Sequence, residues 1–165
     1  MTITRLFYLA LFVVCLSLLG FGLYLEHAQG IEPCPLCAFQ RMCYIAITLI
    51  ALASAIHNPT SWMRYIYSGL TLTASLIGVG IAGRQTWLQH LPPELVPECG
   101  PGLEYMMEVF PFADAMKMIL SGSGECAEVH WSFLSFSIAE WSLVCFSLIL
   151  IATLFVTFFI KSKKL

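Results

Sequence analysis

The chain has 165 residues, of which 59% are hydrophobic and only 11% are charged, and its formal net charge at pH 7 is −2. Its mean hydropathy of +0.83 is higher than a soluble domain of this size needs to fill a core. The few basic residues are scattered along the chain, so we expect no nucleic-acid partner. The composition therefore favours a protein that is embedded in a membrane.

Four apolar stretches account for this composition, and each is long enough to cross a bilayer as one helix. A bilayer core of about 30 Å needs about 20 apolar helical residues. The stretches do not alternate as barrel strands do, so helices are expected to satisfy the backbone polar groups in lipid. The first stretch is too long for a signal peptide and lacks a small-x-small cleavage site, so we expect it to be retained as an anchor. The predicted spans cover residues 6–25, 38–56, 65–83 and 141–160.

We therefore predict an all-α integral membrane protein, a four-transmembrane-helix bundle that forms a single domain over residues 1–165. Alternating spans place both termini and the 57–64 turn on one side of the membrane. Lysine and arginine are enriched on that side, which predicts that it is cytoplasmic. The exported side then carries one short loop, at about 26–37, and one long loop, at about 84–139.

The long loop contains a segment that predicts a short amphipathic helix. In "PFADAMKMIL", residues 111–120, four apolar side chains recur at helical spacing: Phe112, Met116, Ile119 and Leu120. We interpret this helix as lying on the membrane surface. The alternative is a small folded loop in which the same stripe forms the core. The "SGSGE" sequence that follows, at 121–125, favours a flexible backbone just before Cys126.

The seven cysteines separate by predicted depth. Three lie inside the predicted spans, where we interpret them as packing side chains: Cys15, Cys43 and Cys145. The other four lie in the exported loops, where an oxidising compartment favours disulfides: Cys34, Cys37, Cys99 and Cys126. Four cysteines allow three pairings, and adjacency favours Cys34–Cys37, which leaves Cys99–Cys126.

Two structural interpretations compete with redox chemistry. A structural disulfide suits Cys99–Cys126, which would close a long loop, but it suits Cys34–Cys37 poorly because a two-residue spacer removes little chain entropy. A metal site needs four ligands, and the second half of a paired Cys-x-x-Cys motif is missing. We therefore interpret Cys34 and Cys37 as a pair that opens and closes its disulfide, and we predict no metal.

Cys37 begins the second predicted span, where the unpaired N–H groups and the helix dipole favour an anion. Arg41 follows at i+4 on the same helical face. Both effects are expected to lower the pKa of the Cys37 thiol, and the thiolate is the nucleophile of disulfide exchange. A dithiol at this boundary can meet a soluble partner on one side and a membrane quinone on the other. We predict that Arg41 binds the quinone; the alternative is that Arg41 extends to the lipid head groups.

These residues together resemble the DsbB family, the inner-membrane quinone-linked disulfide oxidases of Gram-negative bacteria. The likeness covers nearly the whole chain: the four-span plan, "PCPLC" followed by Arg41, "LQHLP" after the third span, Cys99, and "GECAE" around Cys126 followed by Trp131. One position departs from the family pattern. Where family members often carry a histidine after the third span, this chain has Gln85 preceded by Arg84, and we assign neither residue a role.

The resemblance implies a relay of disulfides. A soluble periplasmic thiol oxidase of the DsbA type would attack the second-loop disulfide at Cys99, and Cys126 would then attack Cys34. Cys37 would be released as a thiolate beside Arg41 and would donate electrons to ubiquinone or menaquinone. Both disulfides must then be reducible.

The resemblance also implies a place in the cell and leaves two other functions open. The chain would be a multi-pass protein of the bacterial inner membrane, in contact with membrane lipid, with cytoplasmic termini and periplasmic redox loops. One alternative is a related enzyme with a different soluble client. The other is a non-enzymatic four-span scaffold with structural disulfides.

Overall fold

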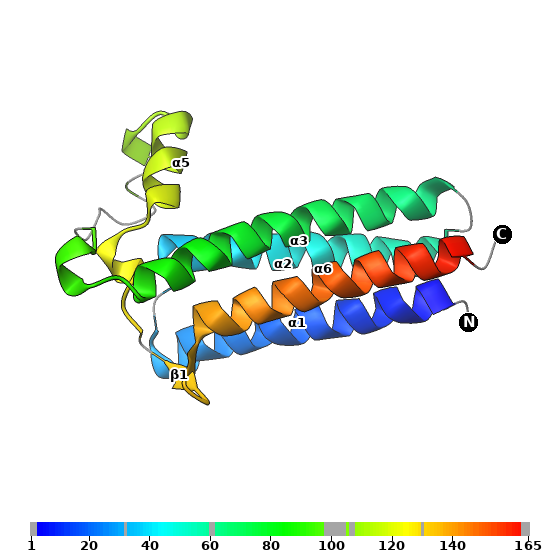
Figure 1. Cartoon of the computed structure of the whole chain (residues 1–165), viewed down its shortest axis with the longest axis horizontal. Helices are drawn as coiled ribbons and strands as arrows, with labels where there is room; N and C mark the ends of the chain where they lie inside the picture. Colours follow the sequence, from blue (N-terminus) through cyan, green and yellow to red (C-terminus); the bar gives the residue numbers. More distant parts are fainter. Residues whose placement is uncertain are drawn as a thin grey trace.

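The computed structural model describes residues 3–31, 33–59, 62–97, 105, 108–129 and 131–162. Four helices in these ranges are long and apolar enough to cross a membrane. They are α1 (Ile3–Gln29), α2 (Pro35–His57), α3 (Trp62–Gln89) and α6 (Ile138–Ser162), and each contains one of the predicted spans. Figure 1 shows the four lying side by side with both termini at the same end. The predicted all-α four-helix membrane fold is confirmed.

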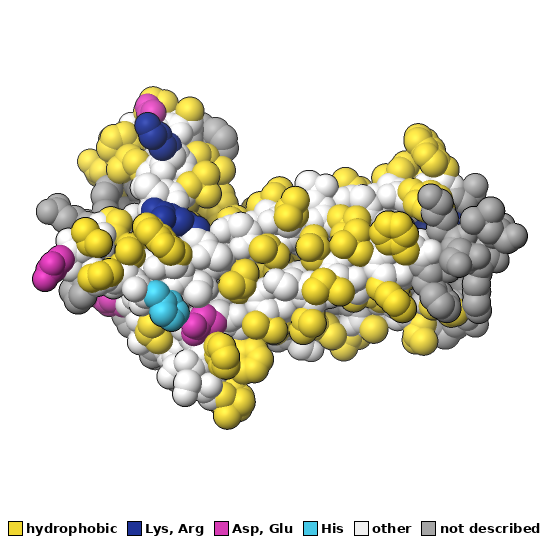
Figure 2. Space-filling model, in the orientation of Figure 1, with side chains coloured by type: hydrophobic (Ala, Val, Ile, Leu, Met, Phe, Trp, Pro, Cys, Tyr) yellow, Lys and Arg dark blue, Asp and Glu magenta, His cyan; other side chains and the backbone are white. Residues whose placement is uncertain are grey.

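The outer surface of the bundle is apolar over most of its length. Side chains such as Leu49, Leu76 and Leu148 are about three-fifths exposed (61%, 62% and 60%) although they lie in the middle of long helices. On the face shown in Figure 2, charged side chains gather at the end that carries α5, and the middle of the bundle is hydrophobic. A soluble protein avoids so large an apolar surface, whereas lipid accommodates it. The chain is therefore a multi-pass membrane protein.

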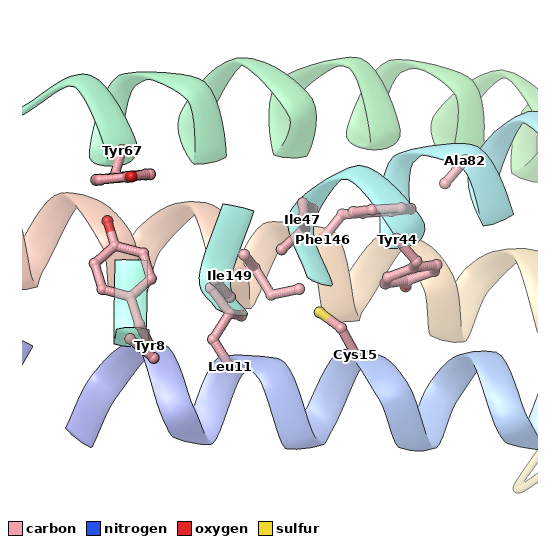
Figure 3. Packing of buried hydrophobic residues seen from close by; sticks show 11 residues of the cluster. Tyr8, Leu11, Cys15, Tyr44, Ile47, Tyr67, Ala82, Phe146 and Ile149 are labelled. Atoms are coloured by element: carbon pink, nitrogen blue, oxygen red, sulfur yellow. The ribbon is translucent and has the colours of Figure 1, made fainter. Parts of the chain in front are cut away.

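The interior of the bundle is a closely packed cluster around Cys15, Ile47 and Phe146, each of which is fully buried. Figure 3 shows Cys15 pointing from α1 into this cluster. The Phe146 ring stacks on Tyr44 with the ring centroids 4.1 Å apart. A Cβ added at Gly78 of α3 would lie 2.5 Å from the Phe146 ring, so only glycine permits this approach of α3 to α6.

The predicted loop helix is present as α5 (Phe112–Ser121). It runs across the direction of the bundle helices at one end of the molecule (Figure 1), as a helix at the membrane surface would. Its apolar stripe is only partly covered by the protein, because Ile119 is buried whereas Leu120 is 48% exposed. The other loop elements are η1 (Pro93–Leu95), η2 (Gly124–Cys126) and a hairpin of β1 (Ser132–Phe133) with β2 (Phe136–Ser137).

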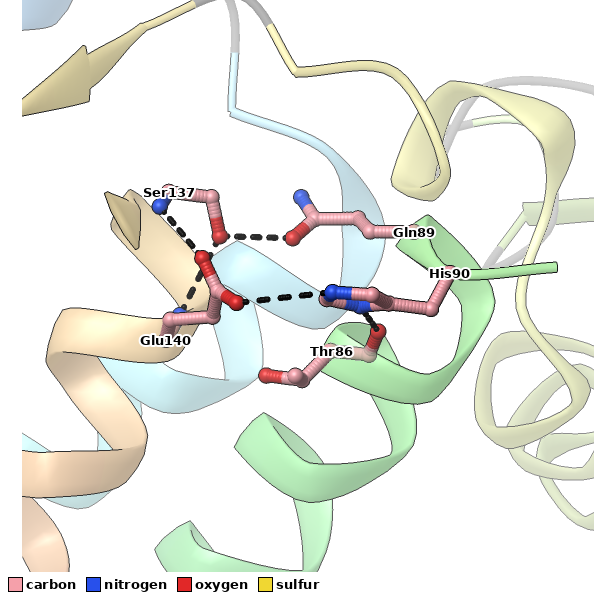
Figure 4. Close-up of polar contacts among 5 residues, drawn as sticks. All are labelled: Thr86, Gln89, His90, Ser137 and Glu140. Carbon is pink, nitrogen blue, oxygen red and sulfur yellow. Dashed lines mark hydrogen bonds and ion pairs between the residues drawn. The ribbon is translucent and has the colours of Figure 1, made fainter. Parts of the chain in front are cut away.

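A polar junction joins the end of α3 to the start of α6 (Figure 4). The Ser137 N–H donates to Glu140 Oε2 at 2.6 Å, and the Glu140 N–H donates to Ser137 Oγ at 3.2 Å, which is a capping box. Ser137 Oγ also donates to Gln89 Oε1 of α3 at 2.6 Å, and His90 Nε2 lies 3.7 Å from Glu140 Oε1. These contacts fix the position of α6 against α3 at the end that carries the loop cysteines.

Candidate active site

The Cys-x-x-Cys segment forms the first turn of α2. Cys34 is the N-cap residue, and Pro35 at the first helical position holds the backbone in a helix-ready conformation. The Cys37 N–H donates to Cys34 Sγ at 3.4 Å, and both side chains are thiols with their Sγ atoms 3.0 Å apart. The pair therefore lies at the helix N-terminus, where the dipole favours negative charge on sulfur.

Cys126 of the second loop lies against this same turn. Its side chain is fully buried and packs with Leu36, Ile81 and Leu88. A hydrogen bond from the Cys34 thiol lowers the pKa of the Cys126 thiol to about 6, with further help from the backbone at Leu36 and from Ser123, against the opposing effect of burial. Hydrogen bonds with Cys126 and Cys37 in turn raise the pKa of Cys34. The structure thus brings a second-loop cysteine with a lowered pKa to a first-loop cysteine.

Contacts between α3 and the second loop hold Cys126 in this place. Arg84 Nη2 donates to the Ser121 carbonyl oxygen at 2.8 Å, and its guanidinium lies 4.3 Å from the Trp87 ring centroid. Gly122 ends α5 with φ of 81°, and a Cβ there would lie 2.3 Å from Leu88. Only glycine fits both this backbone conformation and this contact. The segment before Cys126, for which the sequence favours flexibility, is packed: Ser123 and Gly124 are both buried.

Two buried glutamines meet the sulfurs of the Cys-x-x-Cys pair. Gln85 Nε2 of α3 donates to Cys37 Sγ at 3.1 Å and to Cys34 Sγ at 3.3 Å. Gln40 Nε2 of α2 donates to Gln85 Oε1 at 2.7 Å. The position at which the sequence departs from the family's histidine is therefore in direct contact with the thiols. Sequence reasoning assigned Gln85 no role, because a neutral amide carries no chemical signature of its own.

Arg41 lies one turn after Cys37 in α2 and reaches across to α1. Its guanidinium donates to the Glu26 carboxylate and, at 3.1 Å, to the Gly22 carbonyl oxygen. Sequence reasoning also missed Glu26; the signal available was an acidic residue at the end of an apolar span. Arg41 is therefore held in place by α1, and its charge is balanced locally.

The thiols and Arg41 share a cavity of about 120 Å³, which Tyr44 and Leu18 also line. This cavity continues into a second one of about 500 Å³, since Leu18, Gly22 and Tyr44 line both. The larger cavity is lined almost entirely by apolar side chains of α1, α6 and the hairpin segment, among them Phe21, Trp131 and Trp141. A small chamber with a few polar side chains on its wall, which opens into an apolar groove, suits a flat ring with polar oxygens and a hydrocarbon tail.

The structure thus brings together four of the five predicted site residues: Cys34, Cys37, Cys126 and Arg41. The fifth, Cys99, lies outside the described residues, so the Cys99–Cys126 pairing stays a prediction. The Cys34–Cys37 disulfide also stays a prediction, although the two sulfurs are neighbours. In the described parts of the chain, no three His, Cys, Asp or Glu side chains are grouped as metal ligands would be.

Comparison with known proteins identifies the family. Residues 4–156 match the family model described as "Disulfide bond formation protein DsbB". The chain is 52% identical over 146 residues to Disulfide bond formation protein B of Aromatoleum aromaticum, covering 88% of this chain and 87% of that protein. It is 47% identical over 154 residues to the protein of the same name from an Azoarcus species, covering 93% and 92%. The chain belongs to the DsbB family of disulfide bond formation proteins.

Proposed function

We propose that this chain oxidises a periplasmic dithiol protein of the DsbA type and passes the electrons to a membrane quinone. The observation that carries the proposal is the contact of Cys126 with Cys34, because it joins the two exported loops into one series of neighbouring thiols. The last thiol of this series is Cys37, which lines a cavity that continues into an apolar groove. A route from soluble protein to lipid is what such an oxidase requires.

The first exchange is at the second-loop disulfide. A thiolate of the client attacks Cys99, which forms a mixed disulfide with it and releases Cys126. A thiol with a pKa of about 6 is a good leaving group, so Cys126 is suited to this release. The client's second thiol then attacks the mixed disulfide, which frees the client with a new disulfide bond and leaves Cys99 reduced.

The second exchange moves the electrons to the first loop. Cys126 attacks Cys34 in the Cys34–Cys37 disulfide and releases Cys37 as a thiolate at the N-terminus of α2. Cys99 then attacks Cys126, which restores the second-loop disulfide and leaves both first-loop cysteines reduced. Each exchange breaks one S–S bond and forms one, so two electrons move inward for each client oxidised.

The residues that line the cavity beside Cys37 fit a quinone. Arg41 lines the cavity and presents hydrogen-bond donors for ring oxygens, and the apolar groove beside Trp131 and Trp141 fits an isoprenoid tail. A bound quinone supplies a two-electron acceptor that leaves as quinol, after which Cys34 and Cys37 are again a disulfide. Glu26 holds the Arg41 guanidinium on the cavity wall.

We place the chain in the bacterial inner membrane with cytoplasmic termini and periplasmic thiols. Two observations support this orientation. Both termini lie at the same end of the bundle (Figure 1), and the start of α2, which carries Cys34 and Cys37, lies at the other. Arg5 and Arg64 are at the end with the termini, which agrees with the preference of basic residues for the cytoplasm.

The test is quinone reduction by the purified protein with a reduced DsbA-type client and a short-chain ubiquinone, followed by quinone absorbance. We expect turnover in the wild type and in Cys43→Ala, which changes a packing cysteine of α2. We expect none in Cys37→Ser or Cys99→Ser. Wild-type protein that holds quinone and both disulfides without turnover would indicate another client. Disulfides that resist reduction would reject the oxidase and favour the scaffold.

A further inference from the structure

The two glutamines at the thiols form a connected pair across two helices. Gln85 of α3 and Gln40 of α2 are 3% and 4% exposed. Gln40 Nε2 donates to Gln85 Oε1 at 2.7 Å, which leaves the NH₂ group of Gln85 turned toward the sulfurs. That group lies 3.1 Å from Cys37 Sγ and 3.3 Å from Cys34 Sγ. Both of these Cys···N distances are within hydrogen-bonding reach for sulfur.

We propose that Gln85 is a catalytic residue whose amide stabilises the thiolate formed on Cys37, and that Gln40 is a positioning residue which keeps that amide turned toward sulfur. The inference deepens the proposed function, because it assigns the group that stabilises the negative charge on Cys37 when Cys126 attacks Cys34. Hydrogen bonds to a charged acceptor are about twice as strong as those between neutral groups.

Arg41, the charged donor in the cavity, makes its hydrogen bonds to α1 rather than to the sulfurs. The Arg41 guanidinium is engaged by the Glu26 carboxylate and the Gly22 carbonyl oxygen of α1. Gln85 is therefore the side chain whose N–H groups contact the sulfurs directly among the described residues. Because Gln85 is buried and the two sulfurs are partly buried, water is a poor substitute for this donor, and its removal is expected to disfavour charge on Cys37.

An amide suits both protonation states of Cys37. Gln85 Nε2 donates to the sulfur when it is a thiolate, and Gln85 Oε1, 3.5 Å from Cys37 Sγ, accepts from the thiol when it is protonated. An amide does not titrate, so its donor is present at every pH at which the protein is folded. A histidine at this position would instead change its charge near neutral pH.

The first test is alkylation of Cys37 in the reduced full-length protein held in lipid nanodiscs. Iodoacetamide reacts with the thiolate, and mass spectrometry with fragmentation measures the product at Cys37 separately from Cys34. In Gln85→Met, which keeps the length but loses the donors, we expect the rate at pH 7 to fall about tenfold. At pH 10, where the thiolate forms without help, we expect a change of less than about twofold. Gln29→Met, the same change at the exposed residue that ends α1, is the matched control and is expected to keep the wild-type ratio of the pH 7 and pH 10 rates.

A second pair of variants leaves Gln85 in place and tests its orientation. In Gln40→Glu an ionised carboxylate can only accept, so Gln85 turns its NH₂ group toward position 40 and its carbonyl oxygen toward the sulfurs, and the added negative charge also disfavours a thiolate on Cys37. We expect the pH 7 rate to fall as far as in Gln85→Met. In Gln40→Met the amide is free to rotate, and we expect a smaller fall, of about threefold.

The alkylation results test the role of Gln85 independently of the proposed oxidase function. An unchanged ratio of the pH 7 and pH 10 rates in Gln85→Met and Gln40→Glu would reject the assignment. Equal falls at both pH values would reject it too, since they would indicate altered access to Cys37. Alkylation uses neither client nor quinone, so a wild-type protein that does not turn over would reject the proposed function while these ratios still decide the role of the glutamines.

Discussion

Cys15 and Cys126 are both fully buried, yet their surroundings favour opposite chemistry. Cys15 points from α1 into the apolar cluster around Ile47 and Phe146 (Figure 3). Cys126 is equally enclosed, but it receives hydrogen bonds from Cys34 and from the start of α2, and its pKa is about 6. Burial therefore does not by itself make a thiol inert. The donors that point at the sulfur decide whether it can hold a charge.

The same contrast separates the middle of the bundle from its thiol end. In the middle, α3 and α6 approach so closely that Gly78 leaves no room for a Cβ beside Phe146. At the thiol end, amides and a guanidinium line a cavity instead, and a carboxylate of α1 pairs with the guanidinium. Packing in the middle supplies stability, whereas the thiol end keeps room for exchange. Substitutions in the two regions should therefore affect different measurements.

The largest expected difference in quinone reduction is between Cys126→Ser and Cys15→Ala. On the proposed relay, Cys126→Ser removes a nucleophile, and client-dependent quinone reduction falls at least about a thousandfold. Cys15→Ala removes only packing, costs about 1 kcal/mol of stability and leaves turnover within about threefold. Quinone absorbance with reduced client measures the first effect, and thermal unfolding in detergent measures the second.

Two results would contradict this comparison. Substantial turnover in Cys126→Ser would mean that electrons reach the first loop without the second-loop thiol. Loss of turnover in a folded Cys15→Ala protein would mean that the middle of the bundle takes part in the chemistry.

The contrast between the two regions also marks what the sequence could predict. The spans and α5 were predictable because hydropathy and helical spacing are local properties of the chain. The contact of Gln85 with Cys37 joins residues 48 apart, and that of Arg41 with Glu26 joins residues 15 apart in different helices. Such contacts depend on how the helices rotate and pack, which the sequence of a single helix does not specify.

Cys126 shows the same limit within the loop. The glycines and serines at 121–125 favour a flexible segment, and their small side chains equally allow a tight fit. In the structure the segment fits tightly, because Gly122 packs against Leu88 and Ser123 is buried. Composition alone could not distinguish these two outcomes.

A second prediction concerns the pH at which Cys126 loses its charge. Its folded-state pKa of about 6 lies below the usual value of 9.0, so the thiolate persists through neutral pH and is lost as the pH falls through about 6. The difference in absorbance at 240 nm between reduced wild type and reduced Cys126→Ser should therefore titrate near pH 6.

The Cys34 donor can be tested in the same titration. Cys34→Ser keeps a hydroxyl donor and should hold the midpoint of Cys126 close to that of the wild type. Cys34→Ala removes the donor and should raise the midpoint by about one pH unit or more. A midpoint near 9 in the wild type would show that the donors around Cys126 do not stabilise its charge.

The smallest expected effect is at Gly78, in the middle of the bundle. A Cβ there would meet the fully buried Phe146 ring at 2.5 Å, and that ring is stacked on Tyr44, so it has little room to move. We expect Gly78→Ala to lower the free energy of unfolding by about 1–3 kcal/mol. Gly80→Ala is the matched control, because nothing lies within 4 Å of the Cβ it would add, and a helical alanine is slightly favourable. Thermal unfolding in detergent compares the two.

Gly78→Ala also tests how independent the two regions are. Tyr44 stacks on Phe146 and lines the cavity beside Cys37, so it is the side chain through which a strained core would reach the thiols. Cys126 contacts α2 at Leu36, two turns from Tyr44, and receives its hydrogen bonds from groups that the Phe146 ring does not touch. We therefore expect the 240 nm midpoint of Cys126 to stay near pH 6 in Gly78→Ala although stability falls. A midpoint that moves with stability would mean that the packed middle sets the chemistry of the thiol end, and the division between the two regions would fail.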